Sequence, residues 1–215
     1  MSPLTRSTPM ASVNLFDSDR SHYPRFDDGP DVRKFCVPIR PDYHRRLFPE
    51  IAFAAELPLF PHQTVGLLLP RGQERTPGNT IRKVYLCRAK ITRLRPGDLL
   101  FFYMSKDDTY AFSQSVTTVG IVEQVVEGAS SDDLIRHTAK RSVFTADSLH
   151  AMNPSASAPV KMIDFLPGGH IEPAVSLDTL VRTRVFCNRP PQSISELTEE
   201  RYAALKPYVA LGFDL

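Results

Sequence analysis

The chain contains no tryptophan and only three cysteines among its 215 residues. Cys36, Cys87 and Cys187 lie far apart and form no C-x-x-C pair, which argues against both a disulfide framework and a zinc site. No apolar run approaches the roughly 20 residues of a membrane span, and the N-terminal segment has no apolar core of a secretory signal. We therefore expect a cytoplasmic protein with reduced thiols and no membrane partner.

Sequence signatures of catalysis and of cofactor binding are also missing. The six histidines form no H-x-H or H-E-x-x-H pair, and the chain has no G-x-S-x-G or P-loop motif. An isolated cysteine paired with a distant histidine as nucleophile and base stays open, but no spacing supports it. We expect no metal, no cofactor and no assigned catalytic residue.

The chain is rich in proline and poor in glycine, with 19 prolines and 10 glycines. This composition indicates many rigid turns and few long helices. The 42% hydrophobic and 23% charged composition is that of a globular protein. Residues 1–21 are polar, interrupted by proline and without periodicity, so we expect a flexible N-terminal arm. Residues 22–215 are expected to form a single domain.

Apolar periodicity predicts a mixed α+β fold, with mainly antiparallel strands around a small barrel-like core and short helices at its ends. The strongest strand is in "PGDLLFFYMS" (96–105), whose two faces are both apolar, followed by "TTVGIVEQVVE" (117–127) as its antiparallel partner. Other strands are predicted at 33–39, 160–166 and 181–188, with a short one at Val65–Leu69, and helices at 41–50, 130–141, 145–152 and 191–209.

Local signals refine several of these elements. Ser130 with Asp133, and Ser193 with Glu196, have the spacing of capping boxes, and Pro167-Gly168-Gly169 predicts a turn. In residues 79–98 the apolar positions recur at helical spacing, interrupted by Arg88, and a helix is the first interpretation. The alternation of Val84 and Leu86 allows a strand instead.

Positive charge is concentrated between Arg71 and Lys106, where nine basic residues face two acidic ones. Such a patch is typical of proteins that bind polyanions, although a merely solvated basic surface has the same appearance. The candidate phosphate contacts are Arg82, Lys83, Lys90, Arg93 and Lys106, each with solubility as the alternative role.

Aromatic residues offer walls for a planar ring, and the candidates are Tyr85, Phe101, Tyr103 and Phe112, each with simple core packing as the alternative. Ser105 and Asn79 are candidates for hydrogen bonds to a base edge, or simply a strand exit and a turn. Arg88 lies where an apolar residue is expected if residues 80–94 are helical. Its guanidinium either pairs with an internal acid such as Asp164 or meets a phosphate or a base edge.

The chain resembles the PUA-like superfamily, in particular its EVE and ASCH branches. The matching residues are Gly97-Asp98, Phe102-Tyr103, Ser105 and "VGIVE" (119–123), and Tyr85 and Arg88 fall on two positions of the EVE "N-Y-Q-A-R-N" segment. The order of elements matches over about 33–206 and the motifs over about 97–123. Residues 24–206 also resemble a PUA-like module found after acetyltransferase domains in bacteria.

This resemblance implies a β-pseudobarrel with a cleft that accepts a flipped or unpaired base. Members read modified bases in DNA or RNA, and the related SRA domains read 5-methylcytosine. Because the chain has no tryptophan, its pocket would rely on Phe and Tyr. The expected function is a nucleic-acid-binding reader of a modified base, with 5-methylcytosine in DNA as the first candidate and RNA as a possible partner.

Two other functions stay open. An ASCH-like amidohydrolase acting on a modified nucleoside would use Lys83 and Glu123. A protein-interaction module would serve an acyltransferase or a toxin–antitoxin system.

Overall fold

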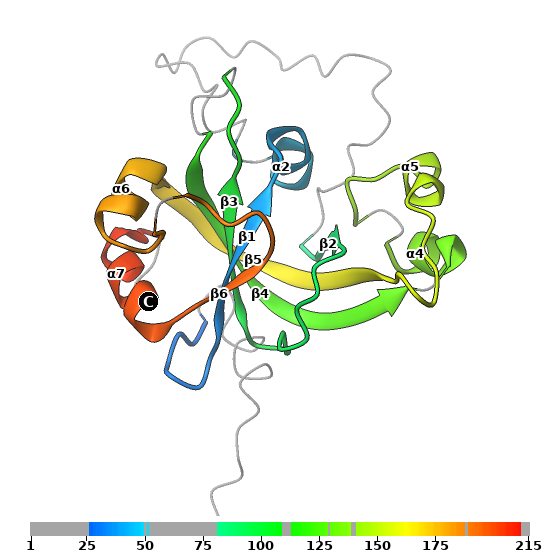
Figure 1. Ribbon diagram of the computed structural model, residues 1–215, viewed down its shortest axis with the longest axis horizontal. Helices are drawn as coiled ribbons and strands as arrows, with labels where there is room; N and C mark the ends of the chain where they lie inside the picture. The colour runs from blue at the N-terminus through cyan, green and yellow to red at the C-terminus, as the bar shows by residue number, and fades with distance from the viewer. Residues whose placement is uncertain are drawn as a thin grey trace, which may run out of the picture.

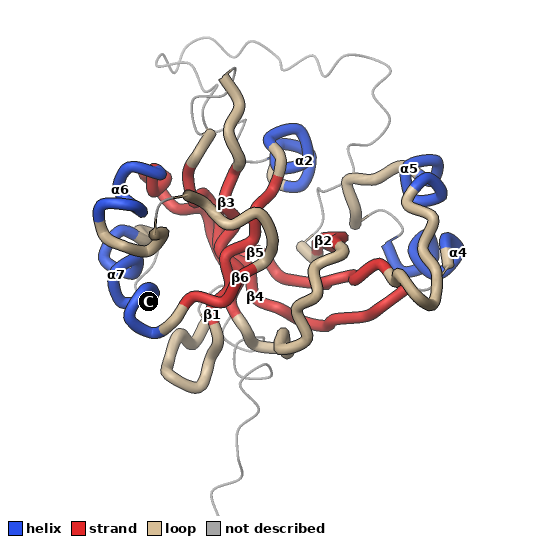
Figure 2. Tube along the Cα trace, viewed as in Figure 1, coloured by secondary structure: helices blue, strands red, loops and turns tan. Residues whose placement is uncertain are grey.

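A single curled sheet of six strands organises the protein (Figures 1 and 2). The structure is a computed structural model, and it describes residues 26–49, 51, 81–108, 113–128, 130–138, 141–187 and 189–211. The strands are β1 (Lys34–Ile39), β2 (Lys83–Cys87), β3 (Leu99–Met104), β4 (Ser115–Gly128), β5 (Val160–Ser176) and β6 (Ser195–Leu197). They lie side by side in the order β2-β5-β4-β3-β1-β6, and only the β1–β3 pair is parallel.

Short helices lie around the two ends of this sheet. They are α2 (Pro41–Leu47), α4 (Ser131–Thr138), α5 (Ala146–Ala151), α6 (Leu177–Arg182), α7 (Glu199–Leu205) and the 3₁₀ helix η1 (Lys206–Tyr208). Figure 1 shows α6 and α7 at one end of the long strands β4 and β5, α4 and α5 at the other, and α2 beside the middle of the sheet. The predicted class, α+β with mainly antiparallel strands and helices at the ends, is confirmed.

Strand β3 is buried on both faces, as its uniformly apolar sequence predicts. Leu99, Phe101 and Tyr103 pack into a core with α6, α7 and residues 185–186, while Leu100 and Phe102 belong to a second core beneath α2. A third cluster lies beneath α4 and α5. The sheet therefore separates the first core from the second, and the second lies beneath a pocket next to α2.

Close packing between strands requires a glycine at one position of β4. A Cβ atom on Gly120 would lie 2.7 Å from Cδ2 of Phe165 and 3.2 Å from Cε2 of Phe102. Both rings are fully buried, so they have little room to move. Gly120 thus lets two aromatic rings meet across the sheet.

Several predicted elements are confirmed. The strands at 33–39 and 117–127, the antiparallel pairing of β3 with β4, and the helices near 41–50, 130–141 and 145–152 are present. One half of the predicted capping box is present, because Ser130 Oγ accepts from the Asp133 N–H at 3.2 Å; the Asp133 carboxylate accepts from the Ser130 hydroxyl at 2.7 Å. Local patterns were sufficient for these elements.

The helix predicted within residues 79–98 is wrong, and the strand alternative holds for Lys83–Cys87. Val84 and Leu86 face the cluster under α4 and α5, while Tyr85 and Cys87 face the core under α2. Pairing with β5 gives this segment its extended conformation, which helical spacing alone did not reveal.

Two further predictions at the C-terminal side are corrected. Strand β5 continues through 167–169 to Ser176, because it stays paired with β4 across irregularities in register, so no chain reversal occurs there. Residues 177–182 form helix α6, where 181–188 were expected to form a strand.

The expected helix pair at 191–209 is instead strand β6 followed by α7 and η1. Thr198 caps α7 by accepting a hydrogen bond from the Arg201 N–H, so Ser193 and Glu196 form no capping box. The arm at 1–21 and the strand at Val65–Leu69 lie outside the described residues.

Candidate functional site

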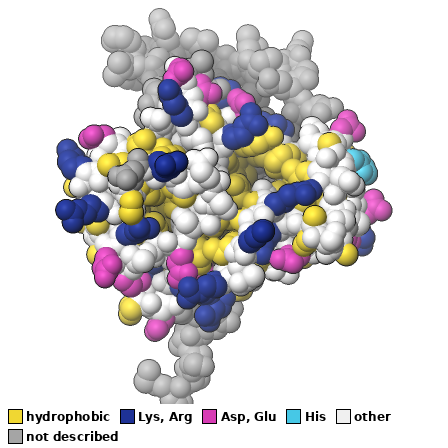
Figure 3. All heavy atoms as spheres, viewed as in Figure 1, with side chains coloured by type: hydrophobic (Ala, Val, Ile, Leu, Met, Phe, Trp, Pro, Cys, Tyr) yellow, Lys and Arg dark blue, Asp and Glu magenta, His cyan; other side chains and the backbone are white. Residues whose placement is uncertain are grey.

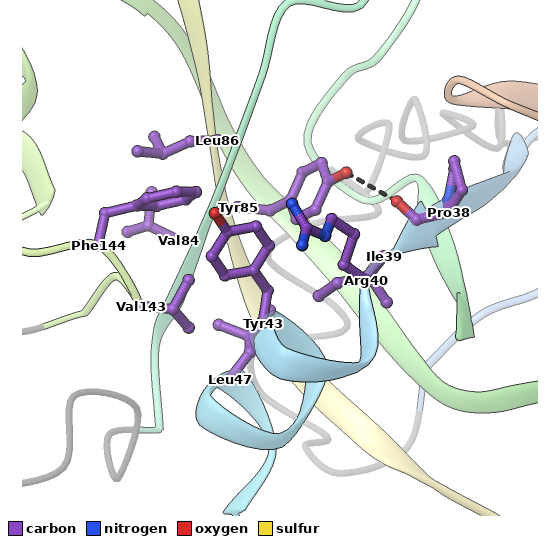
Figure 4. A pocket seen from close by; sticks show the side chains of 10 residues that line it. All are labelled: Pro38, Ile39, Arg40, Tyr43, Leu47, Val84, Tyr85, Leu86, Val143 and Phe144. Carbon is purple, nitrogen blue, oxygen red and sulfur yellow. Dashed lines mark hydrogen bonds between the residues drawn. The ribbon is translucent and has the colours of Figure 1, made fainter. Parts of the chain in front are cut away.

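A pocket of about 180 Å³ lies between the end of β1, helix α2, strand β2 and residues 143–144. Figure 4 shows side chains from these four segments around one space, although they are far apart in the sequence. The lining residues are Pro38, Ile39, Arg40, Tyr43, Leu47, Val84, Tyr85, Leu86, Val143 and Phe144. This is a small, largely apolar site with one cationic side chain.

Three aromatic rings form much of the wall. The centroids of Tyr43 and Phe144 lie 4.9 Å apart with the ring planes at 43°. Tyr85 donates its hydroxyl hydrogen to the carbonyl of Pro38 at 2.9 Å and rests edge-on against Phe102, with centroids 6.0 Å apart. Burial raises the pKa of the Tyr85 phenol above its ordinary value, so it remains a neutral donor at physiological pH. The Tyr85 ring is therefore held in place as one wall of the pocket.

Helix α2 presents one wall because its opposite side is anchored in the core. The helix begins at Pro41, where the fixed φ of proline suits the first turn. His44 is buried, with Nε2 2.6 Å from Thr117 Oγ1. Tyr43 and Leu47 are four residues apart and so lie on one side of the helix, toward the pocket.

Residues 141–144 form the wall opposite β1. The Val84 N–H donates to the Arg141 carbonyl at 3.0 Å, which attaches this segment to β2. The carboxylate of Asp164 lies 2.9 Å from His137 Nε2 and 3.5 Å from Arg141 Nη1. These contacts hold the chain that carries Val143 and Phe144.

Charge at the pocket is positive. The guanidinium carbon of Arg40 lies 5.5 Å from the centroid of the Tyr43 ring, and Arg40 is exposed. Figure 3 shows hydrophobic side chains gathered in a hollow beside α2 and β2, with Lys and Arg on its rim. Within the described part of the chain, no acidic side chain lines the pocket. An anionic or neutral planar ligand suits this arrangement better than a cation.

Of the predicted base-binding residues, Tyr85 lines the pocket. Phe101 and Tyr103 do not, because both are 1% exposed and face the opposite layer of core. Tyr103 packs edge-on against Phe186 at 5.4 Å, and Phe101 packs against Tyr202 at 5.7 Å. The space expected beside Tyr103 is thus filled by the protein's own side chains, which corrects this part of the prediction.

The Tyr103 hydroxyl is buried and has no hydrogen-bond partner among the described residues, and burial raises its pKa to about 12. Buried hydroxyls usually have a hydrogen-bond partner, so Tyr103 is an exception among the described residues.

Arg88 is exposed and donates through Nη2 to the Met152 carbonyl, so it does not lie on an apolar helix face. Its predicted pairing with Asp164 is wrong, because His137 and Arg141 contact that carboxylate. Ser105 lies at the end of β3, and its N–H donates to the carbonyl of pocket residue Ile39 at 2.9 Å. Asn79 and Phe112 lie outside the described residues.

The predicted phosphate contacts are dispersed. Arg82 pairs with Glu123 at 3.1 Å, Arg93 with Glu196 at 2.9 Å, and Lys106 with Asp108 at 3.5 Å. Lys90 is exposed. Lys83 is 2% exposed and donates to the Leu47 carbonyl at 2.5 Å, so it is a buried structural lysine and not a surface contact.

Three residues that line the pocket were not among the candidates from the sequence: Arg40, Tyr43 and Phe144. "PDYHRR" offered a weak signal, since a tyrosine lies among basic residues at the start of a helix. Phe144 lies in a loop with no periodicity. No spacing in the sequence links Arg40, Tyr43 and Phe144, which only the fold brings together.

The described residues contain no group of three potential metal-ligating side chains. None of the described helices has the length and apolarity that crossing a membrane requires.

No protein-family model matches the chain, and no curated protein matches it in sequence. Solved structures do match. The ASCH protein from Zymomonas mobilis superposes with a TM-score of 0.54 at 15% identity, over 83% of this chain and 96% of that one. A single-residue variant of the same protein gives a TM-score of 0.55 at 14% identity, over 85% of this chain and 100% of the other.

A weaker similarity connects the chain to human THYN1 protein, whose structure is a complex with 5-methylcytosine-containing DNA. The TM-score is 0.40 at 12% identity, over 80% of this chain and 94% of that one, and we draw no conclusion from it. The ASCH matches cover more than four fifths of this chain and at least 96% of the other. The chain therefore has a PUA-like fold, in the form found in ASCH domains.

Proposed function

We propose that this protein binds nucleic acid by taking one unpaired base into the pocket between α2 and β2. The observation that carries the proposal is a pocket of about 180 Å³ with walls of Tyr43, Tyr85 and Phe144 and Arg40 at its mouth. Pockets for drug-sized ligands are roughly 300–1,000 Å³, so this one suits a single ring system better than a whole nucleotide. The PUA-like fold is in keeping with a cleft of this kind.

Stacking supplies the energy for binding a base here. Base–aromatic stacking contributes about 1–3 kcal/mol per base, while extruding a paired base costs a few kcal/mol. A base that is already unpaired avoids this cost, so single strands should bind more tightly than duplexes. Arg40 is placed to contact a phosphate next to the inserted base, and such a contact adds affinity without sequence information.

The more specific form of this proposal is that the bound base is modified, with 5-methylcytosine in DNA as the first candidate. Ile39, Leu47, Val84 and Val143 make part of the lining aliphatic. A methyl group that contacts such a surface gains about 0.8 kcal/mol when it is fully buried. RNA remains the alternative polymer.

An amidohydrolase built on Lys83 and Glu123 has no support from the geometry. Arg82, which precedes β2, pairs with Glu123, whereas Lys83 is buried and donates to the Leu47 carbonyl. The ammonium of Lys83 lies beneath α2, 5.4 Å from the centre of the Phe48 ring. The two proposed catalytic groups therefore contact different partners.

Fluorescence anisotropy at a fixed low salt concentration tests the proposal. The panel consists of single-stranded and duplex oligonucleotides of DNA and RNA, each with cytosine or 5-methylcytosine. We expect measurable affinity for single strands, weaker affinity for the matched duplexes, and a gain of up to about fourfold from the methyl group. Absence of binding to every member of the panel would refute nucleic-acid binding.

Replacing Arg40 with alanine should weaken binding and reduce the salt dependence. If Arg40 contacts one phosphate, the slope of log K against log salt should decrease in magnitude by about 0.7–0.9. The side chain of Arg40 makes no cap hydrogen bond to α2, so the helix should be retained. Arg182→Ala, on exposed α6, is the matched control and should leave the slope unchanged. An Arg40→Ala slope equal to that of the wild type would exclude the contact.

A further inference from the structure

Strand β2 lies at one edge of the sheet and borders the pocket. Among the described strands, it pairs with β5 alone. In an antiparallel ladder, alternate residues direct their N–H and C=O groups toward the partner strand or away from it. The Val84 N–H donates to Arg141 rather than to β5, so Val84 is an outward-facing residue. Leu86, two positions further along, is outward-facing as well.

Leu86 therefore presents its own N–H and C=O at the pocket that its residue lines. The Arg141 carbonyl accepts the hydrogen bond from the Val84 N–H. Within the described chain, no residue pairs with the N–H or C=O of Leu86. Because backbone donors and acceptors that lose water need partners, these two groups favour a ligand that supplies both.

The N–H and C=O of one extended residue form a donor beside an acceptor, facing the same direction. The edges that bases use for Watson–Crick pairing have the complementary arrangement. Cytosine and adenine present an amino donor beside a ring-nitrogen acceptor, while thymine, uracil and guanine present a ring N–H beside a carbonyl. The C5 position of a pyrimidine lies on a different edge of the ring.

Resting on the proposed function, we propose that the pocket recognises a base by its Watson–Crick edge, through the N–H and C=O of Leu86. The rings of Tyr43 and Phe144, whose centroids are 4.9 Å apart, then contact one face of the base. A base engaged in Watson–Crick pairing has no free edge for Leu86, so the site takes bases only from unpaired positions. Substituents at pyrimidine C5 leave this recognition intact.

Amide hydrogen exchange of the full chain, followed by NMR, tests the inference directly. The probes are single-stranded DNA hexamers of cytosine and of thymine. In the free protein we expect the Leu86 amide to exchange faster than that of Tyr85, whose N–H points toward β5. On adding a hexamer that binds, exchange at Leu86 should slow markedly, while exchange at Tyr85 should change little.

Modified hexamers provide an independent readout. N3-methylthymine and N4,N4-dimethylcytosine block the Watson–Crick edge without adding charge, and they should bind about 5- to 150-fold more weakly than the parent bases. 5-Methylcytosine serves as the control and should bind at least as tightly as cytosine.

Binding with unchanged Leu86 exchange, or equal binding of blocked and unblocked hexamers, would overturn the inference and leave the proposed function standing. Failure of every hexamer to bind, together with failure of the RNA members of the anisotropy panel, would refute both.

Discussion

Replacing Phe102 with alanine is expected to lower the free energy of unfolding by about 3–5 kcal/mol. Phe102 is fully buried at the centre of the core beneath the pocket, with ring centroids 5.0 Å from Phe48 and 4.9 Å from Phe165. Truncation removes these contacts and leaves a cavity that the neighbouring rings can fill only in part. Domain stabilities are typically 5–15 kcal/mol, so this change would remove a large share of the total.

Urea unfolding measures this effect, with Phe102→Leu as the matched variant. Leucine keeps most of the buried volume, so its cost should stay below about 1.5 kcal/mol. A loss of less than 1 kcal/mol for the alanine variant, at an unchanged m-value, would show that the rings around Phe102 are not the centre of the core.

Replacing Tyr43 with alanine is expected to weaken binding of a single-stranded oligonucleotide by about 5- to 150-fold, which corresponds to the loss of about 1–3 kcal/mol of stacking. Tyr43 is partly exposed on α2 and packs at the margin of the core beneath that helix, so the buried centre of the core should be retained. Alanine is a good helix former, which favours retention of α2. The effect should appear in affinity, measured by anisotropy at constant salt.

Tyr208→Ala is the control for this experiment. Tyr208 lies on η1, is 41% exposed and is not part of the pocket lining. Its removal should leave affinity unchanged. Equal affinity of the Tyr43→Ala and Tyr208→Ala variants would place the binding surface elsewhere on the protein.

Local sequence was a sufficient guide where neighbouring residues decide the structure. The unbroken apolar run of 99–104 and the pattern of 117–127 predicted two paired strands, and Ser130 with Asp133 predicted a helix start. Each of these signals depends on residues close together in the chain. The same holds for α2, which begins at a proline.

The position of the pocket relative to β3 could not be predicted in this way. Alternation shows that Phe101 and Tyr103 share one face and that Phe102 lies on the other, but not which face is covered. Phe186 and Tyr202, from the C-terminal part of the chain, cover the Tyr103 side. The other side carries α2 and the pocket.

Long-range contacts also explain the missed residues and the misassigned helix. Parallel pairing of β1 with β3 places the start of α2 beside the sheet, and the hydrogen bond from Val84 to Arg141 brings in Phe144. Pairing of residues 83–87 with β5 overrides the helical spacing of that segment. Tyr85 was a candidate from its motif position and lines the pocket, while its neighbours in space are distant in sequence.

Intermolecular NOEs between the protein and a short single-stranded oligonucleotide test the central claim most directly. If a base enters the pocket, its ring protons should show NOEs to the rings of Tyr43, Tyr85 and Phe144 and none to Tyr208. Base-proton NOEs confined to surfaces away from α2 and β2, with the resonances of those three rings unchanged on binding, would contradict the account.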